Sequence, residues 1–348
     1  MGVTLSLTLQ GRGWFKTREG RFGVSITGRT ALGAGIVVAG LALAFQLSPW
    51  PSALLIRWAF DSGGWRSNAL LASRVPAGVS AQLDKTYDPQ DPDARLDVYY
   101  PAASPAPLTV VWIHGGGFVS GSKEQIANYA RILAAGGYTV VAVDYSVAPA
   151  RTYPTPLLQV NRALGFLLQD AGRLHITPER IVLAGDSAGA QIAAQLANII
   201  TSPAYARSVG VTPSITRLAG VLLYCGPYAM TGTPGGGLAA RWFARTVQWS
   251  YSGRRDYTGD PRSATLALVN FLTPRFPPTF ISVGNADSLA PQSYALAGAL
   301  ARQGVRVDAL FFPADYDSQL PHEYQFSLET REARLALTRS QQFLDSLH

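Results

Sequence analysis

One pentapeptide restricts the fold of this chain more than any other feature: Gly185-Asp186-Ser187-Ala188-Gly189. It follows the apolar run 181–184 and precedes a helical pattern that begins at Ala188. A turn from strand to helix at this point is so sharp that side chains two residues before and two after the serine would collide, so both positions need glycine. The pattern predicts a strained Ser187 whose hydroxyl lies at the carboxyl edge of a sheet.

The rest of the chain predicts an α/β fold with a mostly parallel central sheet flanked by helices. From about residue 80 onward, short β-rich runs alternate with longer helical patterns, and most of the runs are almost continuously apolar. We expect strands at 96–100, 108–113, 139–144, 181–185, 218–224, 279–283 and 307–312. We expect helices at 123–135, 157–170, 188–201, 291–303 and 327–347.

The composition is that of a folded protein without covalent cross-links. Of the 348 residues 47% are hydrophobic, which is too many for a disordered chain. Cys225 is the single cysteine, so an intrachain disulfide and a cysteine-based zinc site are both excluded. Because Cys225 ends a predicted buried strand, we expect it to be a small core residue. The four histidines are at positions 114, 175, 322 and 348.

Positive charge is concentrated at the N-terminus. Residues 1–60 contain six Arg and Lys residues against one Glu, whereas the other 288 residues are nearly neutral in total. No basic stripe interleaved with aromatic residues follows, so the sequence predicts no nucleic-acid binding.

The segment that follows the basic residues is predicted to be a membrane anchor. Residues 30–47 carry no charge and would span ~27 Å as a helix, close to the ~30 Å apolar core of a bilayer. The preceding cationic residues predict that 1–29 is cytoplasmic and that the body of the protein, 80–348, lies on the non-cytoplasmic side.

Residues 48–79 are expected to be an interfacial linker beyond this span, because Trp50, Trp58 and Phe60 alternate with leucines. Two other interpretations of the apolar segment are open. A cleaved secretory signal is one, since Ala42-Leu43-Ala44 resembles a cleavage site, and the mature protein would then be secreted. A buried helix of a soluble protein is the other, although the segment lacks a polar face.

Residues 228–262 interrupt the alternation of strands and helices. A glycine-rich stretch leads there into a run that contains Trp242 and Phe243, which predicts a cap inserted over a pocket. The alternative is an ordinary surface helix that packs its aromatic side chains into the core.

A second motif, His114-Gly115-Gly116-Gly117-Phe118, follows the predicted strand 108–113. Three consecutive glycines let a loop pass close to the serine and direct backbone N–H groups at an oxyanion, and each such donor contributes ~2.7 to 4 kcal/mol in comparable sites. A flexible glycine linker is the alternative, but it fits poorly between a buried strand and an aromatic residue. We expect the ring of His114 to brace this turn and not to transfer protons.

Together with Asp144-Tyr145-Ser146-Val147-Ala148-Pro149, these two motifs resemble those of the hormone-sensitive-lipase-like family of α/β-hydrolase esterases. The similarity covers about residues 80–345, and the three motifs in this order are more specific than any one of them. The resemblance implies an α/β-hydrolase fold. It also implies an oxyanion hole formed by the amides of Gly116, Gly117 and Ala188, with Gly115 as a further candidate.

The catalytic residues of such a fold follow the order Ser, acid, His along the chain. Of the two histidines after Ser187, His348 is the last residue, which leaves His322 as the general base. Asp287 follows the predicted strand 279–283 and precedes His322 by 35 residues, so it is the predicted acid. The competing acids do not end a strand at this spacing; they are Asp260, Asp308, Asp315 and Asp317.

These residues predict a membrane-tethered serine hydrolase that cleaves small carboxylic esters through an acyl-enzyme, without a metal or organic cofactor. Phe118, Trp242 and Phe243 are the candidate substrate-binding residues, and the resemblance implies short to medium acyl chains. Acyl transfer to another acceptor and amide hydrolysis are open alternatives, because the same machinery serves them. A non-catalytic binding domain displayed on a membrane is a third, disfavoured by the intact set of Ser, Asp and His.

Overall fold

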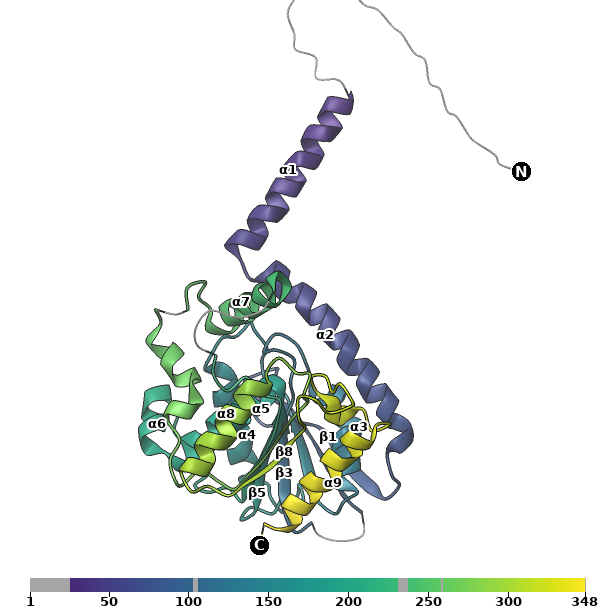
Figure 1. The fold of residues 1–348 in the computed structure, drawn as a ribbon, viewed down its shortest axis with the longest axis vertical. Coiled ribbons are helices and arrows are strands. Elements are labelled where there is room, and N and C mark those ends of the chain that lie inside the picture. The colour runs from purple at the N-terminus through teal and green to yellow at the C-terminus, as the bar shows by residue number, and fades with distance from the viewer. Residues whose placement is uncertain (1–25, 103–105, 231–236, 258, 348) are drawn as a thin grey trace, which may run out of the picture. The chain divides into compact units, whose positions relative to one another are not determined.

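The computed structural model describes residues 26–102, 106–230, 237–257 and 259–347, and the chain divides into two units, Met1–Leu47 and Ser48–His348 (Figure 1). The described part of the first unit is helix α1 (Ile26–Leu47), which contains the predicted anchor, residues 30–47. Its large apolar side chains, such as Val38 and Leu41, are exposed. The predicted cytoplasmic segment 1–29 lies almost wholly outside the described residues.

The membrane anchor stays a prediction. Within the described ranges, no single helix is both long and apolar enough to cross a bilayer. Two successive segments, Gly33–Leu47 and Trp50–Arg74, meet that requirement only when they are taken together.

An eight-stranded sheet forms the centre of the second unit, with the strand order β1-β2-β4-β3-β5-β6-β7-β8. β2 pairs antiparallel with β1 and β4, and all other neighbouring strands are parallel, which confirms the mostly parallel sheet. The sequence does not predict β1, because that edge strand is largely polar and only partly buried. The strands are β1 (Val79–Thr86), β2 (Arg95–Pro101), β3 (Thr109–Ile113), β4 (Thr139–Val143), β5 (Ile181–Asp186), β6 (Gly220–Tyr224), β7 (Thr279–Val283) and β8 (Val307–Phe311).

Helices cover both faces of this sheet (Figure 1). One face packs against α4 (Thr155–Gln169), α5 (Ser187–Thr201) and α8 (Ala290–Arg302), and the other against α3 (Ala127–Ala134) and α9 (Arg331–Asp345). Neighbouring residues of one strand enter different cores, and both cores are apolar. This is why the strands read as continuous apolar runs in the sequence.

The remaining helices surround the carboxyl edge of the sheet or connect its layers. They are α2 (Trp50–Leu71), α6 (Pro203–Val209) and α7 (Leu238–Ser252), with short 3₁₀ turns at Ala72–Arg74, Lys123–Ile126, Pro261–Leu266, Leu268–Asn270 and Tyr324–Phe326. α7 lies inside the predicted cap region 228–262, of which residues 231–236 and 258 are outside the described residues.

Helix α2 occupies most of the segment expected as a linker, residues 48–79. It belongs to the second unit and buries Ala53 and Ile56 in a small apolar cluster with Val119 and Ala148. Arg57 fixes it further, because its guanidinium donates to the carbonyls of Val119 at 2.6 Å and Ala148 at 2.9 Å. The helix is therefore part of the folded body, and it meets α7 where the rings of Phe60 and Phe243 lie 5.6 Å apart.

Candidate active site

Strand β5 passes directly into α5 at Ser187, which has the strained backbone that the pentapeptide predicts. Its φ is +49°, in the left-handed region where residues other than glycine are uncommon. A Cβ added at Gly189 would lie 1.9 Å from the carbonyl oxygen of Ile113, and one at Gly185 would lie 2.5 Å from the backbone of Gly189. Both glycines are required because the backbones of β3, β5 and α5 approach too closely for any side chain.

Three predicted residues from different loops meet at this turn. His322 Nε2 lies 2.9 Å from Ser187 Oγ, and His322 Nδ1 lies 2.6 Å from Asp287 Oδ2. The second oxygen of Asp287 accepts the backbone N–H of Leu289 at 2.8 Å, which fixes the carboxylate. In this arrangement the imidazole can accept the serine proton while the carboxylate stabilises the resulting imidazolium.

Two of the competing acids are engaged elsewhere. Asp260 pairs with Arg262 at 2.7 Å, and Asp308 pairs with Arg339 at 2.5 Å. His348 lies outside the described residues.

The surroundings of His322 set its proton affinity. Burial lowers the pKa of His322, but Cys225, Asp287 and Glu323 each raise it, and the net direction is upward. Because a general base must be unprotonated, we expect the acid limb of the activity profile at a higher pH than for an ordinary histidine.

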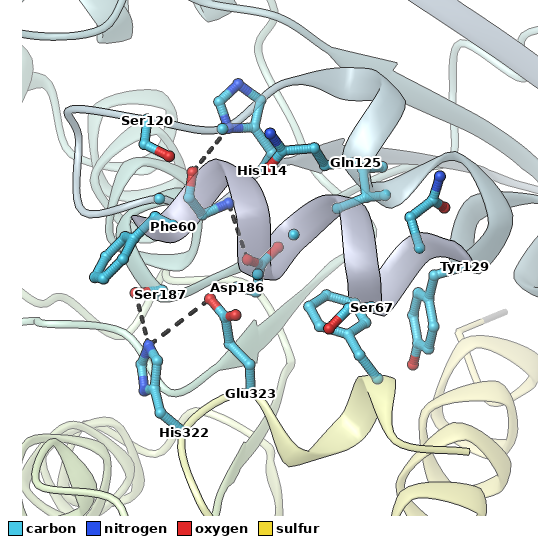
Figure 2. A pocket seen from close by; sticks show the side chains of 18 of the residues that line it. Phe60, Ser67, His114, Ser120, Gln125, Tyr129, Asp186, Ser187, His322 and Glu323 are labelled. Carbon is cyan, nitrogen blue, oxygen red and sulfur yellow. Dashed lines mark hydrogen bonds and ion pairs between the residues drawn. The ribbon is translucent and has the colours of Figure 1, made fainter. Parts of the chain in front are cut away.

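Glu323 provides a direct test of this effect, because its Oε1 lies 3.7 Å from His322 Nε2 (Figure 2). Glu323→Gln removes a negative charge that favours the imidazolium, so the pKa of His322 falls. We expect the acid limb of kcat/KM against pH to move down by about one unit. Glu329→Gln, on the exposed part of the same segment, is the control and leaves the limb in place. An unchanged limb in Glu323→Gln would show that Glu323 does not act on His322.

The glycine loop after β3 provides two free amides and one that is already used. Gly116 has φ +108°, and a Cβ there would lie 2.2 Å from the carbonyl oxygen of Ser120, so only glycine fits. Among the described residues, no acceptor receives the N–H of Gly116 or Gly117. Gly115 differs from the expectation: its N–H donates to Asp186 Oδ2 at 2.9 Å and is not available to an oxyanion. Ala188 lies in the first turn of α5, where amides have no acceptor within the helix.

Asp186 connects the serine turn to this loop. Its carboxylate accepts the indole N–H of Trp112 at 2.8 Å and the backbone N–H of Gly115 at 2.9 Å. Burial raises the pKa of Asp186 well above its usual range, and the neighbouring Glu323 raises it further. The sequence did not predict this positioning role, since the pentapeptide alone does not show which donors surround Asp186.

His114 braces the loop and is held neutral. Its Nδ1 lies 2.8 Å from the carbonyl oxygen of Gly115, and its ring stacks on Tyr145 with centroids 4.2 Å apart. Burial lowers the pKa of His114 to about 4, so the ring carries no charge at neutral pH. The hydroxyl of Tyr145 donates to the carbonyl of His114 at 2.8 Å, which explains why the Asp144-Tyr145 motif accompanies the glycine loop.

A pocket of about 280 Å³ opens beside Ser187 and His322 (Figure 2). This volume is near the lower end for small-molecule sites. Four segments line it besides Ser187: the glycine loop, the turn that carries His322, helix α2, and the segment that contains Gln125, Ile126 and Tyr129. The α2 residues that line it include Phe60, Gly63, Gly64, Ser67, Asn68 and Leu71.

The predicted substrate-binding residues are not among the described residues that line this pocket. Phe118 is fully buried and stacks on Tyr251 with centroids 4.0 Å apart. Trp242 is 43% exposed on α7, whereas the ring of Phe243 contacts Phe60 and would lie 3.7 Å from a Cβ added at Gly117, so it packs beside the glycine loop. Helix α2 lines the pocket, and α7 of the predicted cap packs Phe243 and Val247 beside Gly117. The small residues of α2 that face the pocket at helical spacing were the available signal.

Asp61 attaches α2 to the glycine loop. One oxygen, Oδ1, accepts the hydroxyl of Ser120 at 2.8 Å, the N–H of Gly121 at 3.2 Å and the side-chain amide of Gln125 at 3.0 Å. The same carboxylate thus holds the pocket wall and the end of the loop that carries Gly116 and Gly117.

Asp61→Ala is expected to lower both the melting temperature and kcat/KM, the latter by about tenfold. Loss of the shared acceptor leaves three donors unpaired, at about 1–3 kcal/mol for each buried group, and about 1.4 kcal/mol corresponds to a factor of ten. Thermal melts and ester kinetics measure the effect, with Arg66→Ala on the exposed side of α2 as the control. Unchanged kinetics in Asp61→Ala would show that the attachment of α2 does not position the glycine loop for catalysis.

Known proteins of the same fold resemble this chain. The profile of a family described as alpha/beta hydrolase fold matches residues 110–318, more than half of the chain. Esterase B from Lactobacillus rhamnosis, in a crystal structure with a tributyrin phosphonate, is 25% identical with a TM-score of 0.74, over 85% of this chain and 96% of that one. A bacterial heroin esterase is 26% identical with a TM-score of 0.64, over 83% of this chain and 90% of that one. An esterase from Pyrobaculum calidifontis, at 22% identity and a TM-score of 0.67, covers 85% of this chain and 93% of its own and shows the shared fold.

Proposed function

This chain belongs to the alpha/beta hydrolase fold family, as its motifs predict, and we propose that it is a serine hydrolase that cleaves carboxylic esters through an acyl-enzyme. The observation that carries the proposal is the linear arrangement of Ser187, His322 and Asp287, with distances of 2.9 Å and 2.6 Å between successive partners. The similarity to esterases supports the choice of esters among the substrates that this machinery could cleave.

In the proposed reaction, Ser187 Oγ attacks the ester carbonyl while His322 Nε2 accepts its proton. The amides of Gly116, Gly117 and Ala188 stabilise the oxyanion of the tetrahedral intermediate. His322 then donates the proton to the departing alcohol, and a water molecule activated by the same imidazole hydrolyses the acyl-enzyme. Asp287 keeps the imidazole in the correct tautomer in both halves of the cycle.

The pocket supports short to medium acyl groups. Its volume of about 280 Å³ leaves little room beyond the reacting ester, and Phe60 and Leu71 of α2 supply part of an apolar wall. Esterase B was crystallised with a tributyrin phosphonate, a reagent with four-carbon acyl chains, which agrees with this size.

The test is turnover of p-nitrophenyl esters from acetate to palmitate by the full chain, compared with the matching p-nitroanilides. We expect the largest kcat/KM at short to medium chain lengths and much slower anilide cleavage. Added alcohols that divert the acyl group from water would instead indicate an acyltransferase. A folded protein that cleaves no ester would overturn the proposal.

We propose in addition that the protein is anchored in a membrane through the apolar residues 30–47, with the following helix α2 completing the length that α1 alone does not reach, the N-terminus in the cytoplasm and the hydrolase on the other side. The exposed side of α2 supports contact with lipid, because it carries Leu54, Leu55, Trp58 and Trp65. Trp58 is 74% exposed, and an apolar outer side is unusual for a helix at a water surface. Tryptophan is enriched at the membrane interface, and the basic N-terminal residues favour anionic lipid.

Fractionation of a C-terminally tagged full chain tests this placement. We expect the tagged protein at its full-length size in alkali-washed membranes, with the tag protected from protease added on the cytoplasmic side. A shortened, soluble protein would support the cleaved signal instead. Quenching by brominated lipid should fall more in Trp58→Phe than in Trp249→Phe if α2 contacts the bilayer.

A further inference from the structure

Cys225 is buried in the apolar core, as expected, and it also lies beside the proposed catalytic residues. It directly follows β6 at the carboxyl edge of the sheet, is 1% exposed and has φ +46°. Its backbone N–H donates to the carbonyl of Ser282 in β7 at 2.9 Å, so its backbone is held to the next strand. Its thiol lies within 4.8 Å of a ring nitrogen of His322, which a core position alone would not require.

The thiol forms a cluster with two residues of the site. One potential ligand atom from each of Cys225, Asp287 and His322 lies within 4.8 Å of the others. The three residues follow β6, β7 and β8, which are neighbours in the sheet. The fold itself therefore brings a thiol, a carboxylate and an imidazole to one point.

We propose that Cys225, Asp287 and His322 form a binding site for a thiophilic divalent cation such as Zn²⁺, and that an ion bound there inhibits the hydrolase. Thiolate, carboxylate and imidazole are the usual protein ligands of zinc. Three protein ligands leave the fourth tetrahedral position to water. The single cysteine was expected to exclude a cysteine-based zinc site, but that expectation was too broad, because a mixed set of ligands needs only one cysteine.

The distances allow the site with small side-chain movements. Zinc bonds of about 2.0–2.3 Å place tetrahedral ligand atoms roughly 3.3–3.8 Å apart. The thiol must move inward by up to about 1 Å, whereas the 2.6 Å contact between His322 and Asp287 must lengthen. The thiol proton is released to solvent as the metal–sulfur bond forms.

Inhibition follows from the use of His322 as a ligand. Its Nδ1 contacts Asp287 and its Nε2 contacts Ser187, so a metal ion on either nitrogen removes one of the two interactions that catalysis needs. A metal ion from solvent can reach the site through His322, because the side chain of His322 is 39% exposed while that of Asp287 is 1% exposed.

The first experiment measures inhibition of ester hydrolysis by Zn²⁺ in the full chain, with each variant normalised to its own uninhibited rate. We expect wild type to be inhibited, and Cys225→Ala to need at least about tenfold more Zn²⁺ for half-inhibition. His175→Asn, which removes a histidine far along the sequence from the cluster, is the control and leaves the inhibition unchanged. Equal inhibition of wild type and Cys225→Ala, or no inhibition of wild type, would overturn the proposal.

The inhibitory effect rests on the proposed function, so a second experiment reads the metal site without activity. Co²⁺ added to wild type and to Ser187→Ala should produce a sulfur-to-cobalt charge-transfer absorption that Cys225→Ala lacks. If the absorption band appears in a protein that hydrolyses no ester, the metal site is supported and the proposed esterase function is overturned. Absence of the band in wild type would overturn the site whatever the esterase activity is.

Discussion

Replacement of Ser187 by alanine is expected to reduce kcat for ester hydrolysis by at least about 10⁴-fold. Among the residues that the structure describes, this hydroxyl is the only side-chain oxygen hydrogen-bonded to His322 Nε2, at 2.9 Å, so it is the group placed to form the acyl-enzyme. Alanine leaves the glycines on either side of the turn unchanged and fits the same backbone. We therefore expect the melting temperature to change little.

Initial rates on a p-nitrophenyl ester, together with labelling by a fluorophosphonate, measure this loss. Ser208→Ala, at an exposed position on α6, is the matched control and should keep both the rate and the label. If Ser187→Ala retained the rate or the label, the nucleophile would be elsewhere and the proposed mechanism would be wrong.

Asp287→Asn is expected to reduce kcat by about 10³- to 10⁴-fold, with little effect on folding. Asparagine keeps the shape of the carboxylate and can still accept the N–H of Leu289. It cannot stabilise an imidazolium, and its amide can hold His322 in the wrong tautomer. The loss should therefore appear in kcat and leave the thermal melt largely unchanged.

The matched control is Asp308→Asn, at another acid that the sequence offered, whose partner in the structure is Arg339. Its rate should remain within about threefold of wild type, as for a surface ion pair of small energetic weight. A substantial rate in Asp287→Asn would transfer the acid role to another carboxylate, with Glu323 next to His322 the first to examine.

Local sequence patterns predicted the parts of the fold that depend on local geometry. The pentapeptide around Ser187 predicted both a strained serine backbone, which the structure shows to be left-handed, and the need for glycine, because the collisions involve atoms within a few residues and the adjoining strand. Buried strands such as β7 were predicted at their observed bounds, since both faces of each strand are covered and the apolar run has clear ends.

Features that depend on contacts between residues far apart in the sequence could not be predicted from local patterns. In α2, charged residues such as Arg57, Asp61 and Arg66 are interspersed with apolar ones, so its hydrophobic pattern does not show which side stays exposed. Only the spacing of its small residues points to the side that lines the pocket. Gly115 looks the same as Gly116 in the motif, and only the position of Asp186 shows that its amide is already used. Cys225 lies in the core as predicted, but its position next to His322 was not predictable, because the two residues are distant in sequence.

The two hydrogen bonds of Asp186 bear on attempts to transplant this chemistry. Grafting the pentapeptide onto another parallel sheet would carry Ser187 and its glycines, but it would leave behind the indole of Trp112 and the amide of Gly115. A buried carboxylate without donors costs several kcal/mol or takes up a proton, so the grafted turn would relax away from its working shape. The smallest unit that could be transplanted with its shape intact therefore comprises two adjacent strands, β5 with its turn and β3 with the glycine loop. The pentapeptide alone does not suffice.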